Sequence, residues 1–113
     1  MFGFGKRRVV RTVDAAMLKT MLDQDAALVV DVREPGEFAD GHIAGAINLP
    51  LSSFDPAALP DAEDKTLVLN CAGGKRSAMA LERCAVAQAA VDTHLAGGIG
   101  AWKAAGLPVV RGA

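Results

Sequence analysis

Short apolar runs rich in β-branched residues alternate with stretches of helical pattern along this chain, and this alternation restricts the fold more than any other feature. We predict strands at residues 9–13, 28–32 (LVVDV), 66–70 (TLVLN) and 91–95, with a brief strand in AGAINLP that ends at Pro50. A continuous apolar run such as LVVDV is typical of a strand buried on both faces. Strands that alternate with helices in this way predict a parallel α/β sheet.

The segments between these strands carry helix signals. Asp14 is a candidate N-cap, and behind it the apolar positions 17, 18, 21 and 22 fall on one helix face. Residues 34–40 predict a short helix or turns, residues 74–88 a longer helix, and the glycine turn in AGGIGAW a last short helix. A chain of 113 residues without linkers or repeats therefore predicts one compact domain, over residues 9–111.

Composition and charge limit the function classes. The chain is 51% apolar and 22% charged, as in an ordinary globular protein, and its net charge of −1 gives no support for nucleic-acid binding. No apolar run has the length of a membrane span, and residues 1–8 lack the features of a signal peptide, so we expect a frayed terminus and a cytoplasmic monomer. Two cysteines do not make a disulfide framework.

The stretch CAGGKRS, residues 71–77, carries the strongest functional signal. Cys71 comes directly after the predicted strand 66–70, and ligands of an open parallel sheet bind outside the carboxyl ends of its strands. The small residues Ala72, Gly73 and Gly74 allow their amides to turn inward and form an anion-binding concavity. The next helix starts here, so its free amides also point at the thiol, which predicts a lowered pKa and a thiolate.

Lys75 and Arg76 strengthen this interpretation. Cations in the first turn of a helix oppose the helix dipole, whereas an anionic ligand would make them favourable. Arg76 can offer a planar fork to an oxyanion, and Lys75 a point charge. A buried structural cysteine before a solvated basic turn is the simpler alternative. Because strand end, glycines, helix start and cations coincide, we favour a nucleophilic Cys71 in an anion pocket.

With these residues in view, the chain resembles the single-domain rhodanese family of thiosulfate and persulfide sulfurtransferases. The resemblance rests on VVDVREPGEFADGHIAGAINLP (29–50), CAGGKRS and HLAGGIGAWKAAGLPV (94–109), and it covers about residues 9–110. It implies a five-stranded parallel sheet with helices on both faces. It also implies that Cys71 takes a sulfane sulfur as a persulfide and passes it to a thiol or cyanide acceptor, without a cofactor.

The resemblance also implies roles for the loop. The amides of residues 72–77 (Ala72, Gly73, Gly74, Lys75, Arg76 and Ser77) would hold the persulfide, and Arg76 and Lys75 would hold the oxyanion of a small anionic sulfur donor. Related phosphatases separate their cysteine from their arginine by five residues, whereas four lie between Cys71 and Arg76 here. The shorter loop favours sulfur transfer over phosphatase or arsenate reductase chemistry. A non-catalytic module that binds a protein partner is the other alternative.

Asp31 and Arg33 are secondary candidates, because both lie at the end of the LVVDV strand and hence on the same rim as Cys71. They could make a charged contact near the mouth of the pocket. An ion pair that pins the loop is the interpretation that we favour.

The remaining chemistry-bearing residues are expected to be structural. We expect His42 and His94 to bond loop backbone, and Trp102 to pack in the core. Cys84 lies too far along its helix to form a disulfide with Cys71 and is read as a small buried residue. Histidines and cysteines are too few and too badly spaced for a zinc site.

Overall fold

The computed structural model of the protein describes residues 9–113 and contains one sheet of five strands. The strands are β1 (Arg11–Val13), β2 (Ala27–Asp31), β3 (Ile47–Asn48), β4 (Thr66–Asn70) and β5 (Thr93–Leu95). Their order is β1-β5-β4-β2-β3, and all neighbours are parallel. The predicted fold class is confirmed. The frayed segment predicted for residues 1–8 lies outside the described residues.

Residues 9–113 also contain four α-helices and two short 3₁₀ turns, which connect the strands except for the last helix, which follows β5. The helices are α1 (Ala15–Asp23), α2 (Pro35–Asp40), α3 (Lys75–Val86) and α4 (Gly98–Ala104), and the 3₁₀ turns are η1 (Leu51–Ser53) and η2 (Pro56–Ala58). The Asp14 side chain accepts a hydrogen bond from the Met17 amide, so the predicted N-cap of α1 is confirmed. Within residues 9–113, no helix is both long and apolar enough to cross a bilayer.

Several elements are shorter than predicted. The strand predicted from residue 9 begins at Arg11, and the side chains of Val9 and Val10 are exposed. The strand predicted from residue 91 begins at Thr93. The helix predicted over 74–88 runs from Lys75 to Val86. It starts after Gly74 because Gly74 has a left-handed φ of 107° and is the N-cap residue.

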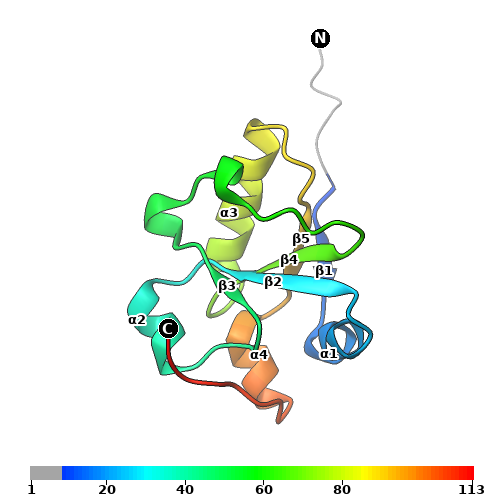
Figure 1. Cartoon of the computed structure of the whole chain (residues 1–113), viewed down its shortest axis with the longest axis vertical. Helices are drawn as coiled ribbons and strands as arrows, with labels where there is room; N and C mark the ends of the chain where they lie inside the picture. The colour runs from blue at the N-terminus through cyan, green and yellow to red at the C-terminus, as the bar shows by residue number, and fades with distance from the viewer. Residues whose placement is uncertain (1–8) are drawn as a thin grey trace.

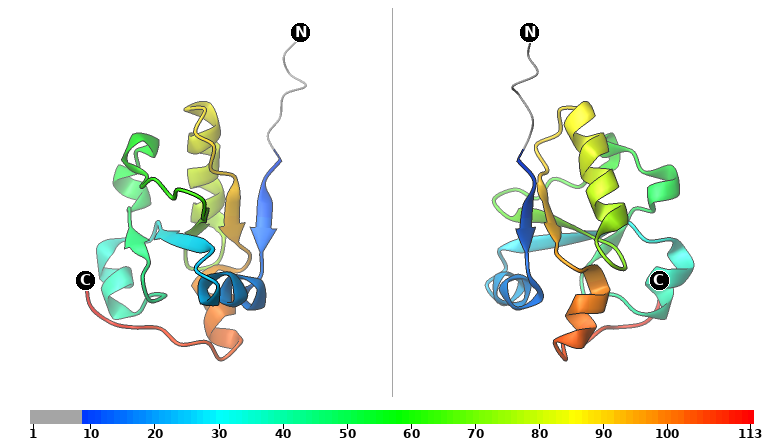
Figure 2. Two further views of the ribbon diagram at one scale, coloured as in Figure 1. Left: turned by 45° about the vertical axis from the view of Figure 1, so that its right-hand side comes forward. Right: turned by 180° about the vertical axis from the view of Figure 1, so that it is seen from behind.

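Helices cover both faces of the sheet (Figures 1 and 2). One face packs on α1 and α4, and the other on α3, which lies behind the sheet in Figure 1 and in front in the right-hand view of Figure 2. Each face has its own apolar cluster, because successive side chains of a strand point in opposite directions. Val29 and Val68 belong to the α1/α4 cluster, and their neighbours Val30 and Leu69 to the α3 cluster.

The carboxyl ends of the strands meet at one edge of the sheet. Cys71 follows β4 at this edge, and α3 begins four residues later. Helix α4 begins three residues after β5 ends, so the first turns of α3 and α4 lie at the same edge. The parallel topology therefore brings the CAGGKRS loop next to the glycine turn before α4.

Candidate active site

Cys71 lies at the floor of the loop between β4 and α3. The residue is only 1% exposed, while Ala72 and Gly73 beside it are exposed. The Gly74 amide donates a hydrogen bond to Cys71 Sγ over 3.0 Å. Gly74 also has a positive φ of 107°, a conformation that suits glycine, and the chain enters α3 directly after it.

The loop is supported from behind by the first turn of α4. The Ile99 amide donates to the Cys71 carbonyl over 2.8 Å, and the Gly100 amide donates to the Ala72 carbonyl over 3.0 Å. Gly98 makes this approach possible, since a Cβ on it would stand 2.4 Å from the Cys71 carbonyl oxygen. Both loop carbonyls are therefore drawn toward α4, away from the sulfur. This role of the GGIG turn was not predicted from the sequence. Glycines placed directly after the last strand are the feature that could have indicated a close approach of two backbone segments.

The surroundings of Cys71 favour the thiolate. Burial by itself would raise the pKa of the thiol, but the Ser77 hydroxyl and the amides of Ser77, Gly74 and Gly73 outweigh it, and the pKa lies below its usual value. Hydrogen-bond donors converge on the sulfur from the loop and from the first turn of α3. This arrangement stabilises negative charge on the sulfur, as a nucleophile requires.

Ser77 connects Cys71 to His94. Ser77 Oγ lies 3.5 Å from Cys71 Sγ, 3.1 Å from the Gly74 carbonyl oxygen and 2.7 Å from His94 Nδ1. His94 comes from β5, where it pairs in register with Leu69 of β4, two residues before Cys71. We had expected His94 to bond loop backbone; its ring instead bonds the hydroxyl that contacts Cys71 Sγ.

Arg76 is bound by a carboxylate. Its Nη1 and Nη2 lie 2.7 and 2.9 Å from the two carboxylate oxygens of Glu37 in α2. The hydrogen bonds from Arg76 lower the pKa of Glu37 to about 2. Glu37 is also held by the backbone, because it accepts from the Glu34 amide over 3.0 Å as the N3 residue of a capping box. Lys75, by contrast, is exposed at the first position of α3.

Asp31 and Arg33 form the buried ion pair that we favoured over a contact at the pocket mouth. Arg33 Nη2 lies 2.8 Å from Asp31 Oδ2, and the side chains are 6% and 0% exposed. Arg33 also donates to the carbonyls of Gly41, over 2.8 Å, and Glu37, over 3.3 Å. The pair thus ties the C-terminal part of α2 to the end of β2. It also touches β4, because the Asn70 side chain donates to Asp31 Oδ2 over 3.4 Å directly before Cys71.

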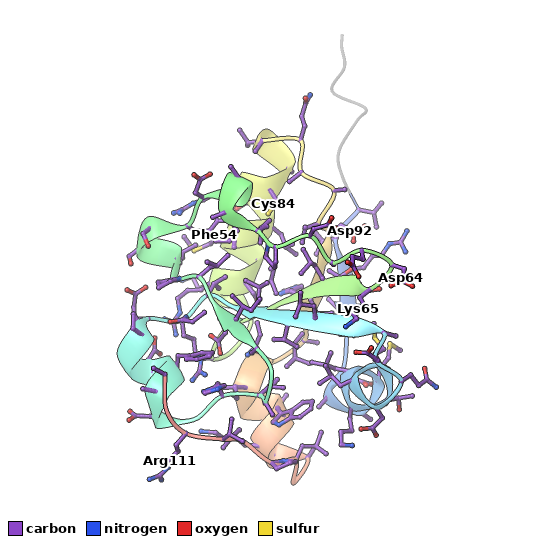
Figure 3. The ribbon with its side chains drawn as sticks, in the orientation of Figure 1. Phe54, Asp64, Lys65, Cys84, Asp92 and Arg111 are labelled. Carbon is purple, nitrogen blue, oxygen red and sulfur yellow. The ribbon has the colours of Figure 1, made fainter. Side chains whose placement is uncertain are left out.

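The other expected structural residues lie outside the loop. His42 Nδ1 is 2.8 Å from the Phe38 carbonyl oxygen, and the two rings stack at 3.7 Å. Trp102 is buried in the α1/α4 cluster and donates from Nε1 to the Pro108 carbonyl. Cys84 is fully buried on α3, and Figure 3 labels it on that helix. These positions agree with the structural roles predicted for His42, Trp102 and Cys84.

A second set of charged side chains gathers at the opposite edge of the sheet. Figure 3 labels Asp64, Lys65 and Asp92 there, just before β4 and β5 begin. A surface cavity lies between Lys65 and Asp92 at this edge. Lys65 is paired with Asp25 over 2.8 Å. Because the carboxyl ends of the strands carry the thiol, this cavity takes no part in its chemistry.

Comparison with known proteins shows the family to which this chain belongs. The model of the Rhodanese-like domain family matches residues 14–105. An uncharacterized protein of Synechocystis sp. is 47% identical over 100 residues, which are 88% of this chain and 56% of that protein, so the chain spans little more than half of that relative. A protein of Allochromatium vinosum named sulfurtransferase is 33% identical over 103 residues, covering 90% of this chain and 96% of the relative.

A solved structure shows the same fold. The crystal structure of a rhodanese-related protein from Thermoplasma volcanium superposes with a TM-score of 0.74 and 38% sequence identity. The match covers 88% of this chain and 97% of that chain. The five-stranded α/β fold of this chain is therefore shared with that rhodanese-related protein.

Proposed function

Because the chain belongs to the rhodanese-like domain family, we propose that it is a sulfurtransferase that carries a sulfane sulfur on Cys71. The observation that carries the proposal is the set of donors on Cys71 Sγ, with the Gly74 amide at 3.0 Å and a thiol pKa below its usual value. Relatives named as sulfurtransferases support it.

In the first step, the Cys71 thiolate attacks the outer sulfur of a small anionic donor such as thiosulfate. The new bond joins Cys71 Sγ to that sulfur, the sulfur–sulfur bond of thiosulfate breaks, and sulfite leaves with the electron pair. The product is a Cys71 persulfide whose charge lies on the terminal sulfur. We assign the amides of residues 72–77 to hold that charge, as the amides of Gly73, Gly74 and Ser77 already lower the pKa of the thiol.

In the second step, a nucleophile attacks the terminal sulfur, and Cys71 leaves again as a thiolate. A thiolate of a small molecule or of a protein is the acceptor that we propose for the cell, and cyanide serves as a test acceptor. No external oxidant or reductant is consumed, because the sulfur–sulfur bond that breaks is replaced by a new bond from the same sulfur to the acceptor, to sulfur for a thiolate and to carbon for cyanide. The two half-reactions predict ping-pong kinetics.

The cations of the loop have different roles in this scheme. Lys75 is exposed at the start of α3 and is the first cation that a donor oxyanion would meet. Arg76 is shared with Glu37, so it attracts an oxyanion less strongly than an unpaired guanidinium would. Asp31 and Arg33 serve the site indirectly, because they hold α2 and thereby the position of Glu37.

The test is an intact-mass measurement after incubation with thiosulfate or glutathione persulfide, followed by cyanide. We expect the parent protein to gain the mass of one sulfur atom and to lose it as thiocyanate. Cys84→Ala is the matched control and should behave like the parent, whereas Cys71→Ser should gain nothing. If the folded, reduced parent gains no sulfur from either donor, a non-catalytic partner-binding module becomes the better interpretation. Hydrolysis of an aryl phosphate by the same sample would indicate phosphatase chemistry instead.

A further inference from the structure

We propose that His94 is a positioning residue for the nucleophile: it donates from Nδ1 to Ser77 Oγ, so that the hydroxyl hydrogen of Ser77 is directed to Cys71 Sγ. The inference rests on the proposed function only in taking Cys71 as the nucleophile. It concerns three side chains from two elements and one loop, with Oγ–Nδ1 at 2.7 Å and Oγ–Sγ at 3.5 Å.

The Ser77 hydroxyl has a single hydrogen to donate. Three groups lie within reach of it, namely Cys71 Sγ, the Gly74 carbonyl oxygen and His94 Nδ1. If Nδ1 carried no hydrogen, the shortest contact would take the hydroxyl hydrogen, and the sulfur would receive none. If Nδ1 carries a hydrogen, Oγ accepts from the ring and its own hydrogen is available to the sulfur or to the carbonyl.

The negative charge of the thiolate favours one direction of the Ser77 hydroxyl hydrogen and one tautomer of His94. A negative sulfur attracts the hydroxyl hydrogen more strongly than the neutral carbonyl of Gly74 does. The same charge favours the tautomer with a hydrogen on Nδ1, so that Nδ1–H donates to Oγ and Oγ–H donates to the sulfur. Hydrogen bonds linked in this way polarise and strengthen one another.

His94 acts in its neutral form. Burial lowers the pKa of the His94 ring, which is 9% exposed, and no net charge is needed for the donor chain. The Arg76 charge of α3 interacts with Cys71, and Arg76 is in turn bound to Glu37 of α2. Because these two form an ion pair, they leave the stabilisation of the thiolate mainly to the hydrogen-bond donors.

The donor chain serves both half-reactions. It raises the fraction of Cys71 present as thiolate before the attack on the donor, and it stabilises the thiolate that leaves in the second step. While the persulfide is present, its charge lies on the terminal sulfur and Sγ is neutral. The Ser77 hydroxyl can then donate to the Gly74 carbonyl over 3.1 Å instead, so it donates to Sγ only while Sγ carries the charge.

The experiment measures the pKa of the Cys71 thiol from the ultraviolet absorbance of its thiolate, with the spectrum of Cys71→Ser subtracted to remove Cys84. His94→Gln and His94→Asn are the informative pair, since the amide nitrogen of Asn occupies the place of Nδ1 and that of Gln the place of Nε2. We expect His94→Gln to raise the thiol pKa by about one unit and His94→Asn to keep it near the parent value.

A double variant completes the test. Ser77→Ala should raise the thiol pKa by itself, and His94→Gln should add little in that background, because its effect passes through the hydroxyl. An unchanged thiol pKa in His94→Gln, or full additivity with Ser77→Ala, would overturn the proposal. The titration uses no sulfur donor. If His94→Gln shifts the thiol pKa but the parent forms no persulfide, only the proposed function is contradicted. If the parent forms the persulfide but His94→Gln leaves the thiol pKa unchanged, only this inference is contradicted.

Discussion

Arg76 and Glu37 join the first turn of α3 to the first turn of α2 through two parallel hydrogen bonds of 2.7 and 2.9 Å. The two residues are 39 positions apart in the sequence, yet the pair stands directly beside the loop that carries Cys71. The Arg76 charge is thus already partly neutralised before any anion binds. This relationship sets the first two predictions.

Replacing Glu37 by glutamine should strengthen the binding of an anionic donor. Glu37→Gln leaves the Arg76 charge unneutralised, so we expect the KM for thiosulfate to fall about three- to tenfold, with a steeper dependence on salt. Steady-state kinetics of thiocyanate formation measure this. Glu82→Gln is the matched control, because it makes the same charge change at an exposed position of α3. A rise in KM would show that Glu37 serves instead to orient Arg76.

The same pair predicts how stability depends on acid. The Glu37 pKa is lowered from 4.5 in the unfolded chain to about 2 in the folded protein, so the pair stabilises the fold fully above pH 4.5 and loses this effect as pH falls toward 2. Because the Glu37 side chain is 40% exposed, we expect a contribution of no more than about 1 kcal/mol. Urea unfolding of the parent and of Glu37→Gln should differ at neutral pH and converge in acid. A difference that stays constant with pH would contradict this assignment.

Gly98→Ala should disrupt the backbone hydrogen bonds that join the Cys71 loop to the first turn of α4. Its Cβ would stand 2.4 Å from the Cys71 carbonyl oxygen, at a φ of 59° that already disfavours a side chain, so we expect a loss of at least about 3 kcal/mol in unfolding free energy. Gly106→Ala is the matched control. Its φ is 76° but its Cβ would meet nothing within 4 Å, so it should cost only the strain of about 1–2 kcal/mol. Equal losses in the two variants would show that the close approach to Cys71 is unimportant.

Arg33→Met should be strongly destabilising, because it leaves the Asp31 carboxylate charged and buried without its partner. Breaking a buried ion pair in this way costs about 3–5 kcal/mol. The double variant with Asp31→Asn removes both charges and should regain part of that loss. Chemical denaturation of the single and double variants measures both effects. If the double variant is no more stable than Arg33→Met, the cost comes from lost packing and not from the uncompensated charge.

Local sequence predicted the parts of the site that lie close together in the chain. The apolar run of β4, the small residues after Cys71 and the start of α3 occupy one stretch, so their relative geometry follows from the elements themselves. The ion pair of Asp31 and Arg33, two positions apart, was predicted for the same reason. Element ends were less well placed. Gly74, predicted to begin the helix, has a left-handed φ and lies outside it, and its amide donates to the sulfur.

The contacts that the sequence did not reveal join distant segments. Arg76 with Glu37 and Ser77 with His94 depend on the order of the strands in the sheet, since β5 lies beside β4 and brings His94 next to Leu69. Single-sequence patterns identify strands but do not give their order or register. A histidine at a strand end was visible, but the hydroxyl that it meets was not.

The backbone bonds from Ile99 and Gly100 to the carbonyls of Cys71 and Ala72 have a consequence for biosynthesis. A chain emerging from the ribosome presents Cys71 about thirty residues before the segment that shapes its loop, and domains fold as units once such segments are available. Until then, the nascent thiol lacks both the scaffold of α4 and the neighbouring β5 histidine. Reactivity of the Cys71 thiol should therefore develop only when the whole domain has folded. The incomplete nascent chain would then be protected from early thiol reactions.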